Sequence, residues 1–181
     1  MIFPGGRLPL RIFEQRYLDM VKRAIADKST FGICAIREDD KARALAIPFE
    51  VGTLVRVTDW DMPQTGILHI QTEALERFVI RSTRSEASGL LMGKVDEVSP
   101  EPARAVPDEL SLATEILRHI IDELGAENFP PQHDLHNAVW VGYRLSEVLP
   151  LKLKAKQNLL EMNDSLTRLQ ILTEFLRKQI N

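Results

Sequence analysis

The sequence predicts an α+β protein, with a β-rich lobe over residues 1–103 and a helical lobe over residues 104–181. Two patterns support this prediction. Apolar and polar residues alternate with the period of half-buried strands in most of the first lobe, and apolar residues recur every three or four positions in the second. The segment between them, Ser99–Pro107, carries three prolines that disfavour both helix and central strand. Together the two lobes would form one domain.

The chain opens with a turn, a strand and a helix in immediate succession. Pro4–Gly6 has the composition of a turn. The alternation that follows predicts a strand over Leu8–Ile12, and Pro9 places it at a sheet edge or a bulge because proline cannot donate a ladder hydrogen bond. Near Glu14, a carboxylate suited to a helix N-terminus, the period becomes helical. The apolar face of this helix is predicted to carry Tyr17, Met20, Val21, Ala24 and Ile25.

Further alternating segments predict the remaining strands of the first lobe. These strands are expected over Phe31–Ile36, Thr53–Trp60, Ile67–Ala74, Arg77–Arg81 and Leu90–Val98. Residues 61–66 have the turn chemistry of a hairpin, through aspartate, proline and glycine. The turn would place Trp60, Met62 and Pro63 at the hairpin tip.

The second lobe is predicted to contain four helices. Their apolar stripes end at residue boundaries typical of helices, with Gly125 after the first and Pro150 after the second. Asn163 or Asp164 is a suitable N-cap for the last. The helices are expected over residues 113–124, 138–148, 153–162 and from 163 or 164 to the C-terminus.

Composition limits the classes of partner. The 181 residues suffice for one large domain or two small lobes, and the formal net charge is −3. Residues 1–103 carry 14 basic and 15 acidic side chains, and residues 104–181 carry 9 and 11. Neither lobe has an excess of basic side chains, so nucleic-acid binding is disfavoured. No apolar run has the length of a membrane span and no secretory signal opens the chain, which favours a cytoplasmic location without membrane contact.

The sequence offers no convincing catalytic or metal site. The single cysteine, Cys34, lies in a short apolar run and is read as a small core residue rather than a nucleophile. His133 and His136 supply only two nitrogen ligands, and a helix start capped by Asp134 is the better interpretation. The acidic pairs at 39–40 and 59/61 are read as solvated. Neither a G-x-x-x-x-G-K-[ST] loop nor a G-x-S-x-G elbow is present, so we expect no catalytic residue, no metal and no cofactor.

Several spaced motifs resemble one known family. They are FPGGRLPLRIFEQRYLDM at 3–20, VGTLVRV at 51–57, LERFVI at 75–80, VGYRLSEVLPL at 141–151 and KQNLLEMNDSLTRLQIL at 156–172. In this order they resemble the substrate-binding domain of the Lon proteases, and they span nearly the whole chain. The residues that carry the resemblance are Pro4, Gly5, Phe13, Glu14, Arg16, Tyr17, Gly52, Arg77, Phe78, Lys156, Gln157, Asp164 and Arg168.

The resemblance implies a PUA-like, partly closed β-barrel followed by a C-terminal helical bundle. It also implies a module that selects exposed hydrophobic segments. The leading hypothesis is a non-catalytic module that binds polypeptide segments or a protein partner, through apolar contact in a groove between barrel and bundle, with edge-strand pairing as a further contribution. Candidate contact residues are Trp60, Met62, Pro63 and Phe129; the alternative is that they fold back onto their own lobe. Two other functions stay open: a PUA-like RNA-binding module and an unrecognised small hydrolase.

The resemblance also bears on the start of the chain. Members of the family usually carry an extra apolar strand ahead of the Phe-Pro-Gly turn, whereas only Met1 and Ile2 precede it here. Without that strand a barrel would expose unpaired backbone. We therefore expect either that the native start lies upstream, which we favour, or that the open edge accepts a strand from a partner or a second copy.

Overall fold

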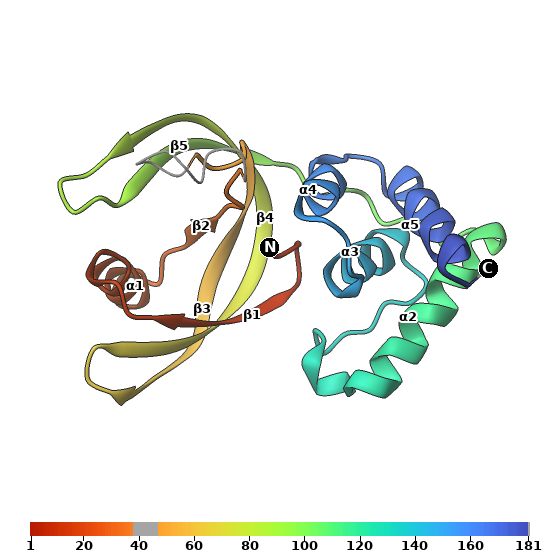
Figure 1. The fold of residues 1–181 in the computed structure, drawn as a ribbon, viewed down its shortest axis with the longest axis horizontal. Helices are drawn as coiled ribbons and strands as arrows, with labels where there is room; N and C mark the ends of the chain where they lie inside the picture. Colours follow the sequence, from red (N-terminus) through yellow and green to blue (C-terminus); the bar gives the residue numbers. More distant parts are fainter. Residues whose placement is uncertain (38–46, 181) are drawn as a thin grey trace. The chain divides into compact units, whose positions relative to one another are not determined.

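The computed structural model describes residues 1–37 and 47–180 (Figure 1). The chain divides into two compact units. One, the sheet unit, comprises Ile2 and Arg7–Ser99; the other, the helical unit, comprises Met1, Phe3–Gly6 and the chain from Pro100 onward. The helical unit thus combines residues from the N-terminal turn with the part of the chain that begins at Pro100.

The sheet unit is built on a five-stranded antiparallel sheet with the order β1-β4-β3-β2, in which β5 also pairs with β4. Its strands are β1 (Arg7–Ile12), β2 (Phe31–Ile33), β3 (Val51–Gln64), β4 (Ile67–Ser85) and β5 (Leu91–Val98). β1 lies at an edge of the sheet, as Pro9 predicts. Within the described residues the pairing path is open from β1 to β2, so the partial closure implied by the resemblance stays a prediction.

The two strands expected over Ile67–Ala74 and Arg77–Arg81 are in fact one strand, β4, which is 19 residues long. β1 pairs with its first half and β5 with its second half. Opposite Leu54 the register with β3 shifts, because Val55 faces Ala74 whereas Thr53 faces Arg77. This bulge changes the phase of the alternation without ending the strand. The prediction of two separate strands was therefore wrong.

The hairpin between β3 and β4 is tighter than the sequence predicted. Its turn consists of Thr65 and Gly66, and Gly66 takes the left-handed φ of 84° that glycine adopts without strain. Trp60, Met62 and Pro63 consequently lie within β3 and not at the tip. Pro63 is accommodated because the β3–β4 register shifts between Asp61 and Gln64.

Helix α1 (Gln15–Asp27) packs against the sheet and contributes to the core of the sheet unit. Its buried residues Leu18 and Val21 pack with Leu68 and Ile70 of β4. The predicted apolar face is shifted by one position at its start: Leu18 is buried, whereas Tyr17 is 36% exposed. The Tyr17 ring is instead covered by the Arg16 guanidinium, 4.7 Å from the ring centroid.

The four helices predicted for the second lobe are confirmed, with small changes at their ends. Among them α3 contacts α2, α4 and α5, and Val141 and Leu145 of α3 are completely buried. In the described part of the chain, no helix is both long and apolar enough to cross a membrane. The helices are α2 (Ser111–Leu124), α3 (Ala138–Val148), α4 (Leu153–Glu161) and α5 (Ser165–Ile180), with short 3-10 turns η2 (Asp108–Leu110) and η3 (Ala126–Asn128).

Asp164 caps α5, and its contribution to stability is expected to depend on pH. Its carboxylate accepts the Thr167 amide at 2.7 Å and lies 3.2 Å from Arg104 Nη1. Chiefly the Thr167 amide holds the pKa of Asp164 below its ordinary value of 3.8. A carboxyl whose pKa is lowered by folding stabilises the fold above that ordinary value, and the stabilisation is lost as the pH falls through the lowered pKa.

We therefore expect Asp164→Ala to be less stable than the wild type at pH 7 and to approach it in acid. Urea unfolding from pH 7 to pH 2 measures the difference. Asp164→Asn is the matched control, because it keeps an oxygen for the Thr167 amide but cannot ionise. A deficit in Asp164→Ala that stays constant with pH would contradict the expectation.

Candidate functional site

The four candidate contact residues differ in what they expose. Trp60 is 55% exposed and Met62 38%, both on β3, and Pro63 beside them is exposed as well. Phe129, in the helical unit, is only 5% exposed, and its ring lies edge-on to His133. Phe129 thus follows the folded-back alternative, and the exposed apolar candidates are gathered on one strand of the sheet unit.

The register of the sheet assigns the side chains around Trp60 to two faces. Trp60 lies opposite the buried Ile70, which is on the face that α1 covers. Asp61 lies opposite His69, on the other face. Trp60 is therefore an aromatic side chain on the apolar face of the sheet that stays largely exposed, a combination typical of contact surfaces.

The aspartates that flank Trp60 bind backbone rather than solvent alone. The amide of Trp60 donates to Asp59 Oδ1 at 2.9 Å, and the amide of Met62 donates to Asp61 Oδ1 at 2.8 Å. Both carboxylates thus occupy main-chain donors of β3.

The signature residues of the first helix hold a turn of the sheet unit. Arg16 donates through Nη1 to the Gly89 carbonyl at 2.9 Å, and its Nη2 lies 2.7 Å from Glu14 Oε2. Gly89, in the β4–β5 turn, has a φ of 80°. Phe13, directly before Glu14, is 67% exposed, so its aromatic ring lies at the surface.

Gly52 and Phe78 pack around Cys34. A Cβ at Gly52 would lie 2.5 Å from Cys34 Sγ and 2.6 Å from the Phe78 ring, so no other residue fits without displacement. Arg77 beside them is buried. Cys34 is only half-buried, so it is not the fully buried core residue that the sequence predicted. Desolvation nevertheless raises the pKa of its thiol to about 11, which keeps the thiol protonated at neutral pH.

The N-terminal turn is held by α3 within the helical unit. The Phe3 amide donates to Glu147 Oε1 at 2.9 Å, and Arg144 Nη2 donates to the Pro4 carbonyl at 2.8 Å. Phe3 is fully buried, with its ring centroid 5.6 Å from that of Tyr143. Gly5 has a φ of 74°, and a Cβ at Gly6 would collide with Glu147 Oε1.

Charged groups around this turn have shifted pKa values. Burial lowers the pKa of Arg144 and raises that of Glu147, although each charge counters the shift of the other. Their ion pair measures 3.3 Å between Arg144 Nε and Glu147 Oε2. Burial also lowers the pKa of Lys156, whose ammonium donates to the Glu147 carbonyl at 2.7 Å. Sequence reasoning missed Arg144 and Glu147, although their i,i+3 spacing in a predicted helix was a visible signal.

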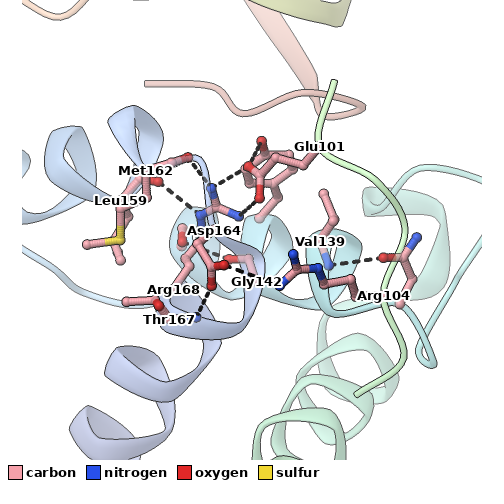
Figure 2. Close-up of polar contacts among 12 residues, drawn as sticks. Glu101, Arg104, Val139, Gly142, Leu159, Met162, Asp164, Thr167 and Arg168 are labelled. Atoms are coloured by element: carbon pink, nitrogen blue, oxygen red, sulfur yellow. Dashed lines mark hydrogen bonds and ion pairs between the residues drawn. The ribbon is translucent and has the colours of Figure 1, made fainter. Parts of the chain in front are cut away.

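A second buried charge pair joins α5 to the segment that precedes α2. Figure 2 shows the Arg168 guanidinium between the Glu101 carboxylate and the carbonyls of Leu159 and Met162. The Tyr143 hydroxyl donates to the same carboxylate at 2.7 Å, and its ring lies 4.4 Å from the guanidinium carbon.

The remaining signature residue, Gln157, is buried in α4 and donates to Glu161 Oε1 at 2.7 Å. The polar signature residues of the helical unit thus stabilise that unit itself. Lys156 and Arg168 bind main-chain carbonyls, and Asp164 caps α5.

Among residues 1–37 and 47–180, the histidine and acidic candidates are not gathered into a metal site. In the described residues no group of three or more His, Cys, Asp or Glu side chains is placed to hold a metal ion. His133 stacks beside Trp140, with ring centroids 5.7 Å apart. The expected cap at Asp134 is wrong, because Asn137 begins α3 and accepts the Val139 amide. The acidic pair at 39–40 lies outside the described residues.

Comparison with known proteins places the sequence in a family. The sequence model described as the ATP-dependent protease La (LON) substrate-binding domain matches residues 1–178. The chain belongs to the Lon substrate-binding domain family. The match contains no protease or ATPase domain.

Solved structures of this family share the fold. The Lon N-terminal domain protein from Xanthomonas campestris is 31% identical, with a TM-score of 0.78 over 95% of this chain and 90% of that one. The N-terminal domain of Mycobacterium avium complex Lon protease is 17% identical, with a TM-score of 0.64 over 96% and 91% of the two chains.

Curated relatives are longer. Lon protease from Amoebophilus asiaticus is 23% identical over 99% of this chain but only 23% of its own length. Protein cereblon from Danio rerio is 27% identical over 61% of this chain and 25% of its own length. This Lon substrate-binding domain thus spans about a quarter of these relatives.

Proposed function

We propose that this chain is a non-catalytic recognition module that binds unfolded polypeptide segments of protein substrates. The observation that carries the proposal is the match of residues 1–178 to a substrate-binding domain family. The proposal places the contact surface on the sheet unit, at Trp60 and Met62, where large apolar side chains stay exposed. It also places the protein in the cytoplasm, where a single reduced thiol is stable.

The buried charges of the helical unit serve its structure rather than catalysis. Glu147, Arg144 and Arg168 each bind a main-chain group, so these groups are used to hold the fold. A protonated Cys34 is a poor nucleophile at neutral pH. We therefore propose that the purified chain hydrolyses neither peptides nor ATP.

The proposal is tested with one small carrier protein in two forms, native and permanently unfolded by reduction and alkylation. Fluorescence anisotropy of the labelled carrier is measured as the chain is added. We expect the unfolded form to bind at least about tenfold more tightly, since only it offers extended apolar segments. Equal affinity for the two forms, or no binding to several unfolded carriers, contradicts substrate recognition.

A further inference from the structure

The free edge of β3 is the feature that this inference concerns. β2 pairs with β3 only at Thr53–Val55, so from Arg56 to Gln64 the described strands leave β3 paired with β4 alone. Backbone amides alternate in direction along a strand, and the amides of Trp60 and Met62, two positions apart, each donate to an aspartate side chain. Donors that bind side chains in this way are expected on the free edge of β3.

Two carboxylates of the chain itself accept hydrogen bonds from amides of this edge. Asp59 and Asp61 each accept the amide of the following residue, and neither forms an ion pair among the described residues. An incoming strand must displace these carboxylates to reach the donors. A displaced carboxylate needs a new partner, and a basic side chain on the incoming strand supplies the strongest one.

We infer that β3 accepts an extended polypeptide segment in which basic and apolar residues alternate. The basic side chains would lie on the face of Asp59 and Asp61, and the apolar side chains on the face of Trp60. Carbonyl groups of the segment would take over the amides of Trp60 and Met62. This inference rests on the proposed function and assigns it a site and a class of segment.

The sheet already contains a strand of this kind in this phase. On the other side of β4, β1 places exposed Arg11 beside His69, on the face of Asp61. It places half-buried Leu10 beside Ile70, on the face of Trp60. The alternation of β1 thus shows which pattern suits each face, and the two aspartates of β3 add charge complementarity for the arginine positions.

The test uses the full chain and three capped ten-residue peptides. One alternates arginine with leucine or valine, a second has the same composition in blocks, and a third replaces arginine by glutamate. We expect the alternating basic peptide to bind at least about tenfold more tightly than either control. Its advantage over the glutamate peptide should shrink at high salt, because the aspartates are at the surface.

Backbone methylation separates strand addition from simple charge attraction. Two versions of the basic peptide carry N-methyl groups on alternate residues, on the odd positions in one and on the even positions in the other. Only the amides that face β3 are needed, so one version should lose binding and the other should keep it. Equal binding by both versions contradicts strand addition.

Variants locate the site. Asp59→Asn with Asp61→Asn keeps an acceptor for each amide but removes the charge, and we expect at least a fivefold loss of affinity for the basic peptide. Trp60→Ala should weaken the basic and glutamate peptides alike. Asp122→Asn, an exposed charge change on α2, is the matched control and should leave binding unchanged. Circular dichroism of each variant verifies that it is folded.

The outcomes separate this inference from the proposed function. Binding of an unfolded carrier that the Asp59/Asp61 and Trp60 variants leave unchanged would overturn the β3 site while the proposed function stands. No binding of any unfolded chain would overturn both. A dimer of this chain that the double Asn variant abolishes, with no peptide binding, would assign the edge to a second copy and also overturn the inference.

Discussion

Replacing Arg168 by methionine should lower the free energy of unfolding by about 3–5 kcal/mol, the range for breaking a buried ion pair from one side. The Arg168 side chain is fully buried and that of Glu101 nearly so, with 4% exposed. Methionine fills much of the volume but leaves the Glu101 carboxylate in a poorly hydrated site. It also removes the donors to the Leu159 and Met162 carbonyls. Urea unfolding measures the change.

The double variant Arg168→Met with Glu101→Gln is the control for this interpretation. It removes the buried charge that the single variant leaves unpaired, so it should be more stable than Arg168→Met alone. A single variant within about 1 kcal/mol of the wild type would show that the pair is better hydrated than its burial indicates.

Phe3→Ala should destabilise the protein by about 3–5 kcal/mol, the usual cost of truncating a buried phenylalanine. Phe3 has no exposed surface and lies against Tyr143, and its amide binds Glu147. The large expected effect therefore tests whether the N-terminal turn is part of the helical unit's core.

Phe3→Leu and Arg7→Ala provide the comparison for this prediction. Leucine retains most of the apolar volume and should cost much less than alanine. Arg7 is exposed on β1 and should tolerate alanine with little change. If Phe3→Ala matched Arg7→Ala in thermal and urea unfolding, the N-terminal turn would be peripheral to the fold.

The helices were the most predictable part of this fold, because their signals are local. The three- and four-residue period of apolar side chains located α3 over Ala138–Val148, and Gly125 and Asp164 marked helix ends correctly. A period of this kind depends on neighbouring residues alone, so it survives without knowledge of tertiary contacts.

The sheet was predicted less well because its pairing is not local. The bulge opposite Leu54 changed the phase of β4 and made one strand resemble two. Another register shift accommodates Pro63 inside β3, where its sequence context predicted a turn. The attachment of Phe3–Gly6 to α3 depends on side chains more than 130 positions away, so no sequence window could reveal it.

In the candidate site, too, local residue types were predictable from the sequence whereas contacts between residues were not. The residue types of Trp60 and Met62 indicated a contact surface, and both are exposed. The roles of Asp59 and Asp61 required the structure, because a carboxylate bound to the next amide has no distinctive sequence pattern. Phe129 was misleading because its ring is buried and lies edge-on to His133.

Titration calorimetry with an unfolded carrier, repeated at several temperatures, tests the central claim most directly. If the chain recognises apolar segments of unfolded substrates, the binding enthalpy must become more negative as the temperature rises, because burial of apolar surface gives a negative heat-capacity change. Binding with no change of enthalpy with temperature, or no heat of binding to any unfolded carrier, would contradict the account.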